Sequence, residues 1–80
     1  MAGSKRKENE QKFKKWITTA MGGRVYRFIV PGKHGWVAHY VKEVDADELT
    51  LSFRQEIYDE SGNLREIHVK YPEDKGHIKL

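Results

Sequence analysis

The chain of 80 residues contains no cysteine, which excludes disulfide cross-links and thiolate metal sites. No run of apolar residues approaches the ~18 that a membrane-spanning helix needs. The first residues, MAGSKRKENEQ, lack the apolar middle of a secretory signal. We therefore expect a cytoplasmic protein that makes no contact with a membrane.

Acidic charge is scarce near the N-terminus. The net charge is +3, from 15 basic and 12 acidic residues. Six basic residues and two glutamates fall within residues 1–15, so the remainder of the chain is close to neutral. A near-neutral sheet argues against a broad phosphate-binding surface. Contact with nucleic acid is expected through Lys12, Lys14 and Lys15, and a solvated helix face is the equal alternative.

A chain of this length forms one domain with a small core. We assign residues 1–7 to a disordered basic N-terminus and residues 8–80 to a single α+β domain. Residues 73–80 are expected to be a loosely ordered tail. Within that tail, Ile78 and Leu80 fit either a short edge strand or a frayed end.

An apolar stripe predicts a helix that begins near residues 7–10. The apolar side chains recur at i, i+3, i+4, i+7 and i+8, which places them on one face of a helix. Gly22-Gly23 supplies a residue that can take positive φ at the C-terminal end. The stripe consists of Phe13, Trp16, Ile17, Ala20 and Met21.

Four later segments are rich in β-branched and aromatic residues and are separated by short polar loops. Short loops favour pairing between consecutive strands, which gives an antiparallel meander. The fold class expected is α+β, with an N-terminal amphipathic helix packed on a four-stranded antiparallel β-meander. The strands are predicted over residues 24–30, 36–44, 49–58 and 64–71.

Side-chain parity predicts which face of the sheet the helix covers. Pairing Tyr58 with Leu64 across the loop at 59–63 would set Arg54 beside His68, on the face away from the core. The predicted core face consists of Val37, Val41, Leu49, Leu51, Phe53, Ile57, Ile67, Val69 and Tyr71.

The opposite face is then unusually rich in aromatic and polar side chains for a surface that meets only solvent. Such patches on monomers usually mark binding sites. We expect this face to bind a partner protein or a second copy of the chain. The predicted binding residues are Trp36, Tyr40, Arg54, Tyr58, His68 and Lys70.

A second hypothesis is RNA-directed chemistry on the same face. Arg54 and Lys70 would hold a phosphate, while Glu56 and His68 would act as base and acid. The tyrosines would stack bases. The structural alternative is a cross-strand charge ladder in which Arg54 lies between Glu56 and Glu66. The sequence leaves open whether any catalysis occurs.

The histidines lack the spacing of a zinc site, and neither a metal nor another cofactor is expected. His39 shares the predicted core face, so we expect it to be hydrogen-bonded or near an edge. The segment PGKHG at residues 31–35 precedes a strand and lacks the nucleotide-loop pattern, which favours a hairpin turn. The histidines are His34, His39, His68 and His77.

The segment IYDESGNLREIHVKYPEDKGHIKL resembles the C-terminal part of small prokaryotic toxins of the TumE type. The similar features are the DESGNL hairpin, the pair Lys70-Tyr71 at the end of the following strand, and the late His77. Such toxins tend to carry Arg-Tyr-Asp where this chain has Lys70-Tyr71-Pro72. The resemblance covers under a third of the chain, and it implies pairing with an antitoxin and nucleotidyl-transfer or RNA-directed toxicity.

Overall fold

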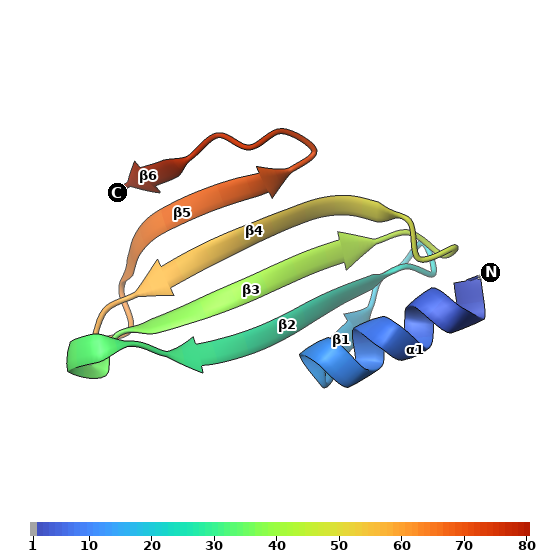
Figure 1. The fold of residues 1–80 in the computed structure, drawn as a ribbon, viewed down its shortest axis with the longest axis horizontal. Helices are drawn as coiled ribbons and strands as arrows, with labels where there is room; N and C mark the ends of the chain where they lie inside the picture. Colours follow the sequence, from blue (N-terminus) through green and yellow to red (C-terminus); the bar gives the residue numbers. More distant parts are fainter. Residues whose placement is uncertain (1) are drawn as a thin grey trace.

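A computed structural model describes residues 2–80, which form one α-helix, a short 3₁₀ turn η1 (Lys33–Gly35) and a six-stranded antiparallel sheet (Figure 1). Each strand pairs with the next along the chain. The α+β class is confirmed, but the sheet has two strands more than predicted. Met1, part of the segment expected to be disordered, lies outside the described residues. The elements are α1 (Ala2–Phe13), β1 (Lys15–Thr18), β2 (Arg24–Pro31), β3 (Val37–Val44), β4 (Thr50–Tyr58), β5 (Leu64–Tyr71) and β6 (His77–Lys79).

The helix begins and ends earlier than the apolar stripe predicts. Lys14 has a φ of 65°, in the left-handed region, which ends α1. Trp16 then lies opposite Tyr26 of β2, while Ile17 points to the other face of the sheet. Aromatic and β-branched side chains favour this extended conformation where a neighbouring strand can pair. The prediction of a helix through Met21 is therefore wrong.

The glycine pair after β1 closes a hairpin and does not cap a helix. Gly22 has a φ of 82°, and its N–H donates to the carbonyl oxygen of Thr19 at 3.0 Å. A β-carbon at Gly23 would collide with the carbonyl oxygen of Val44. Glycine at these positions lets the turn between β1 and β2 close against the end of β3.

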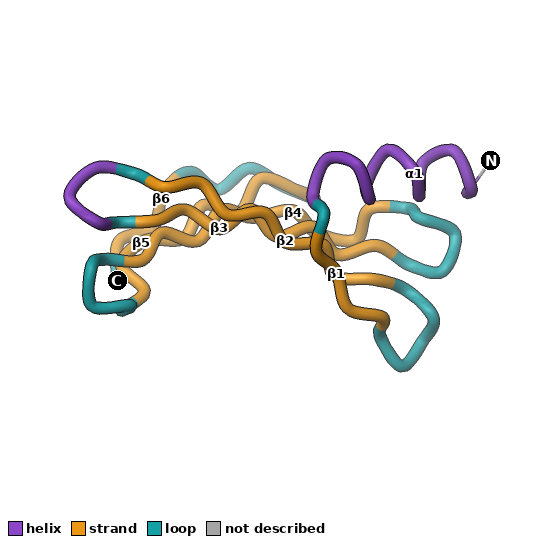
Figure 2. The backbone as a smooth tube through the Cα atoms, turned by 90° about the horizontal axis from the view of Figure 1, so that it is seen from below, coloured by secondary structure: helices purple, strands orange, loops and turns teal. Residues whose placement is uncertain are grey.

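Helix α1 lies along one face of the sheet, the helix face, and the opposite surface is the far face (Figure 2). Phe13 is 3% exposed and anchors the helix. Its ring centroid lies 5.6 Å from that of Tyr26, 6.2 Å from Phe28 and 6.4 Å from Phe53. Burying a side chain of this size stabilises the fold by about 1.5–3 kcal/mol before ordering costs.

A buried carboxylate also holds the helix in place. Glu48, in the turn between β3 and β4, is 3% exposed. It accepts hydrogen bonds from Arg6 Nε at 2.9 Å, Asn9 Nδ2 at 3.0 Å and the Tyr26 hydroxyl at 2.9 Å. Burial alone would raise the pKa of Glu48, but the hydrogen bonds outweigh it and the pKa lies below its ordinary value. The carboxylate is therefore ionised at neutral pH.

The pairing of β4 with β5 decides which side chains share a face. Tyr58 lies opposite Leu64, as predicted, but the register slips by one residue immediately after that pair. Arg54 consequently lies opposite Val69 and not beside His68. A bulge of one residue reverses the face on which the following side chains of a strand lie. A second shift, between Arg54 and Phe53, returns Tyr71 to the face of Phe53.

The predicted core face is wrong, because it combines residues from both sides of the sheet: Val41 lies opposite Arg54 and Lys42 opposite Phe53, so Val41 and Phe53 do not share a face. Leu49 and Leu51, at the start of β4, are 53% and 51% exposed. Phe53, Ile57 and Tyr71 lie on the helix face, whereas Val37, Val41, Ile67 and Val69 lie on the far face.

The C-terminal tail ends in an edge strand. β6 pairs with β5 at the edge of the sheet opposite to β1 (Figure 1). Ile78 lies opposite Ile67, which places it on the far face.

Within residues 2–80, the helix is too short and too polar to cross a lipid bilayer.

Candidate binding surfaces

The side chains that the sequence assigns to one binding face lie on both faces of the sheet. Two registers cause this. The slip between β4 and β5 moves His68 and Lys70 away from the face of Arg54, and the pairing of β3 with β4 sets Tyr40 opposite Gln55, so Tyr40 lies on the other face from Arg54. Glu56 and His68, considered as a base and acid pair, consequently lie on opposite sides and do not form one active site. Tyr40, His68 and Lys70 lie on the helix face, and Arg54, Glu56 and Tyr58 lie on the far face.

Aromatic rings and lysines alternate on the part of the helix face beside α1. Lys70 Nζ lies 5.3 Å from the ring centroid of Tyr40 and 5.8 Å from that of Phe53. The two rings are 6.3 Å apart, and Tyr71 on β5 is 46% exposed. We call this surface the aromatic–lysine platform; it consists of Lys12, Tyr40, Lys42, Phe53, Lys70 and Tyr71.

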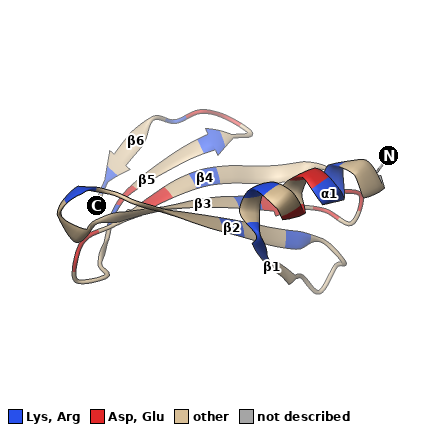
Figure 3. Ribbon diagram, turned by 60° about the horizontal axis from the view of Figure 1, so that its bottom comes forward, with Lys and Arg blue, Asp and Glu red and all other residues tan. Residues whose placement is uncertain are grey.

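A groove of about 380 Å³ separates α1 from the end of β5. Lys12 and Lys42 line it, together with Phe53 and Tyr71. Burial lowers the pKa of Lys42, and the positive charge of Lys12 lowers it further. Figure 3 shows the basic positions on α1 and at the C-terminal end of β5. Two cations facing one groove favour the binding of an anion there.

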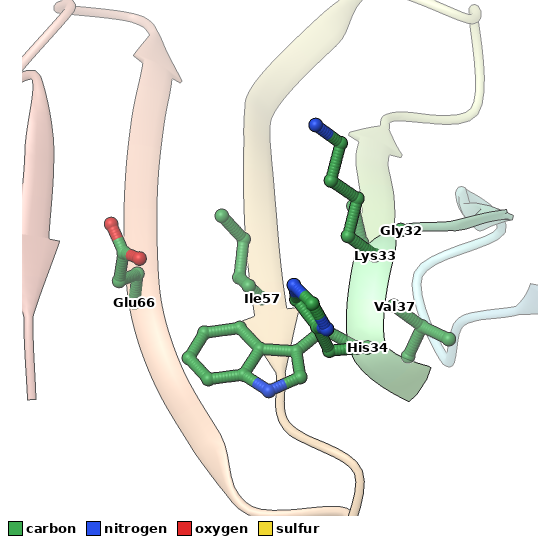
Figure 4. Close-up of a pocket in the computed structure, with 8 residues that line it drawn as sticks. Gly32, Lys33, His34, Val37, Ile57 and Glu66 are labelled. Carbon is green, nitrogen blue, oxygen red and sulfur yellow. The ribbon is translucent and has the colours of Figure 1, made fainter.

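A second hollow, of about 410 Å³, lies at the turn between β2 and β3. His34 and Gly35 have φ of 60° and 78°, and Trp36 N–H donates to the carbonyl oxygen of Lys33 at 3.1 Å, as in a type I′ hairpin turn. Figure 4 shows Ile57 between Glu66 on one side and Lys33 on the other. The lining residues include Lys33, His34, Trp36, Ala38, Ile57 and Glu66.

The far face carries a cluster of charged side chains around Glu56, which is 8% exposed. Glu56 accepts hydrogen bonds from Arg27 Nη1 at 3.1 Å, Arg54 Nε at 2.7 Å and the Tyr58 hydroxyl at 2.8 Å. Arg27 Nη1 also lies 3.2 Å from His39 Nδ1. We call this group the arginine cluster; it consists of Arg27, His39, Arg54, Glu56 and Tyr58. His39 is hydrogen-bonded, as expected from the sequence.

The cluster is suited to binding and poorly suited to acid–base catalysis. Burial alone would raise the pKa of Glu56, but the hydrogen bonds from Arg54, Tyr58 and Arg27 outweigh it and lower the pKa. A carboxylate with both oxygens occupied and a lowered pKa is a weak general base. Burial lowers the pKa of His39, and the charge of Arg27 adds to that effect. His39 is therefore neutral at pH 7 and accepts through Nδ1, because a guanidinium can donate but not accept.

Sequence reasoning missed three members of the platform, Lys42, Phe53 and Tyr71, and two members of the arginine cluster, Arg27 and His39. Phe53 and Tyr71 were assigned to the core, whereas they belong to the platform. Arg27 lies on β2, none of whose residues was assigned to either face, and His39 was assigned to the core. Of the lysines expected to contact nucleic acid, Lys12 lies on the platform, and Lys14 and Lys15 line a separate groove near Arg27 and Ile29.

The histidines near the C-terminus form contacts of their own. His68 Nε2 lies 2.7 Å from Asp74 Oδ1, and the rings of His68 and His77 are 4.4 Å apart. Within the described part of the chain, no three histidine or acidic side chains lie close enough to hold a metal ion.

The two surfaces differ in chemistry. Partly exposed rings and lysines make up the platform, while ion-paired arginines make up the cluster on the far face. Comparison of the chain with protein-family models, curated proteins and solved structures found no match.

Proposed function

We propose that the protein is a small binding module whose aromatic–lysine platform holds single-stranded nucleic acid. The position of Lys70 carries the proposal, because its ammonium group lies within 6 Å of two ring centroids, those of Tyr40 and Phe53. Rings beside cations can bind a base and its phosphate together. A cytoplasmic location, as expected from the sequence, would give the module access to RNA.

Base stacking would supply much of the affinity. Tyr71 is 46% exposed, and Tyr40 and Phe53 are half-buried, so each ring keeps surface for a ligand. One stacked base contributes about 1–3 kcal/mol, and the contribution depends little on which base it is. The platform is therefore suited to binding with little sequence preference.

The distribution of charge favours a single strand over a duplex. Lys12 and Lys42 face a narrow groove beside α1, whereas a duplex needs a broad basic surface. Strand β4 connects this groove to the hollow at the turn between β2 and β3, which Trp36 and Ile57 line. From Phe53 through Gln55 to Ile57 the strand covers about 13 Å, at ~3.3 Å per residue. A path of this length can hold only a short stretch of a single strand, near the lower end of the about 4–16 nucleotides that single-strand-binding domains usually cover. The TumE-type resemblance of residues 57–80 also points to RNA.

Fluorescence anisotropy with a labelled RNA of about ten nucleotides tests the proposal. Three lysine contacts predict a salt slope of about −2, so affinity should fall about 20-fold between about 50 and 200 mM salt. Tyr71→Ala should weaken binding by about 5- to 100-fold, through loss of one stacked base. Lys70→Gln should reduce the slope by about 0.7.

Lys7→Gln is the matched control for Lys12→Gln. Both lysines are exposed on α1, but they lie about 140° apart around the helix. Lys12→Gln should weaken RNA binding and Lys7→Gln should leave it unchanged. Equal effects of the two substitutions, or equal affinity for a duplex of the same sequence, would contradict the proposal.

A further inference from the structure

The far face is a second surface of distinct chemistry, independent of the platform. Its aliphatic residues remain accessible to solvent: Ile17 is 68% exposed, Ile29 43% and Ile78 45%. Ile29 and Ile78 flank the arginine cluster on two sides, because Ile29, His39, Glu56, Ile67 and Ile78 lie in one row across the sheet. A charged centre flanked by exposed isoleucines is typical of a binding surface and not of a face that meets only solvent.

The two arginines of the cluster keep hydrogen-bonding capacity. A guanidinium has five N–H donors, and the contacts within the cluster occupy Nη1 of Arg27 and Nε of Arg54. The side chains of Arg27 and Arg54 are 37% and 34% exposed. Because both guanidinium groups bind the same carboxylate, Glu56, they are held in place before any ligand arrives, which lowers the entropic cost of binding.

The charge of this centre selects its ligand. Two guanidinium groups face one carboxylate, and His39 is neutral at pH 7, so the cluster carries a net positive charge. A second copy packed face to face would bring two such centres together, which like-charge repulsion disfavours. Tyr58 packs against His39 with 4.7 Å between ring centroids and donates its hydroxyl to Glu56, so both ends of this side chain are held within the cluster.

We propose that the far face docks an acidic, aliphatic segment of a partner protein. Carboxylates of the segment bind the outward N–H groups of Arg27 and Arg54 in a bidentate manner. Its aliphatic side chains pack on Ile29 and Ile78. Arginine and tyrosine at the centre of an interface are the residue types that most often dominate binding energy.

A peptide of about ten residues that alternates isoleucine and glutamate is the probe, compared with its isoleucine–lysine counterpart. In NMR titrations, the glutamate peptide should shift the side-chain Nε–H signals of Arg27 and Arg54, and the lysine peptide should not. Arg54→Gln combined with Glu56→Gln should weaken peptide binding about tenfold or more, because a charge-assisted hydrogen bond is lost. The double variant leaves no unpaired buried carboxylate, and its amide spectrum reports whether it is folded.

Arg65→Gln is the matched control, since Arg65 is 52% exposed and lies 3.9 Å from Asp59. It should bind the glutamate peptide as the unmodified protein does. Equal binding of both peptides, or no shift at Arg27 and Arg54, would overturn the proposal. So would a dimer in light scattering that Ile29→Glu abolishes, because a second copy would then occupy the face. RNA affinity should be unchanged by the double variant, which separates this surface from the platform.

Discussion

Replacing Glu48 by glutamine tests whether a buried carboxylate holds α1 on the sheet. The side chain of Glu48 is fully buried, whereas that of Arg6 is 36% exposed. Glutamine keeps the shape of the side chain and one acceptor oxygen. It removes the charge and introduces an NH2 group, which must face either the donors Asn9 Nδ2 and Tyr26 OH or the donor Arg6 Nε.

The loss of stability in Glu48→Gln is set by the two buried donors that contact the carboxylate. Asn9 and Tyr26 are 6% and 0% exposed, so neither donor can turn to solvent. Changing a charge-assisted bond into a neutral or broken one costs about 1–1.5 kcal/mol for each. Loss of the salt bridge between Glu48 and the partly exposed Arg6 adds about 0.5 kcal/mol to this cost. Glu48→Gln should therefore destabilise the protein by about 3 kcal/mol, a large part of the about 4–12 kcal/mol expected for a chain of this length.

Urea denaturation followed by circular dichroism measures the effect. With a slope near 1 kcal/mol/M, the midpoint should fall by about 2–3 M. Asp47→Asn, at an exposed position of the same turn, should change stability by less than about 0.5 kcal/mol.

The pH dependence supplies a second readout. The folded state lowers the pKa of Glu48 below its ordinary value of 4.5. The stabilisation is therefore present above about pH 4.5 and is lost as pH falls through the folded-state pKa. Glu48→Gln should lose less stability on acidification than the unmodified protein. The reasoning is refuted if Glu48→Gln costs under about 0.5 kcal/mol, or if its acid sensitivity is unchanged.

Two further substitutions test the core and the arginine cluster. Phe13→Ala should destabilise the protein by about 3–5 kcal/mol in urea titrations, whereas Met21→Ala, at a side chain that is 90% exposed, should have little effect; equal costs would contradict the anchoring role of Phe13. Glu56→Gln should reduce the loss of thermal stability between neutral and acidic pH, because the folded state lowers the pKa of Glu56. An unchanged acid response would mean that the carboxylate gains no net stabilisation from its hydrogen bonds.

The central strands could be predicted because their signal is local. Runs of β-branched and aromatic residues, separated by glycine, aspartate and asparagine, predict four strands to within one residue of the bounds of β2, β3, β4 and β5. The platform was found in part for the same reason, since Tyr40 and Lys70 lie on predicted strands.

Strand β1 shows where local signals conflict. The spacing of Trp16 and Ile17 after Phe13 satisfies a helical period, and the same residue types favour a strand. The choice depends on pairing with β2, which places Trp16 against Tyr26 and brings the Arg24 guanidinium 4.9 Å from the indole centroid. No local pattern contains that partner.

The sequence by itself determined where the central strands lie, that they pair in order, and that positive charge gathers before residue 16. The tertiary structure decided which side chains meet, placing Lys70 with Tyr40 near Lys12, and Arg54 with Glu56 and Arg27. The reason is that side chains alternate along a strand, so the face of each residue depends on its register with the neighbouring strand, and each bulge reverses that face. Whether such a bulge forms depends on the energy of pairing between strands, and parity within a single strand does not contain that information.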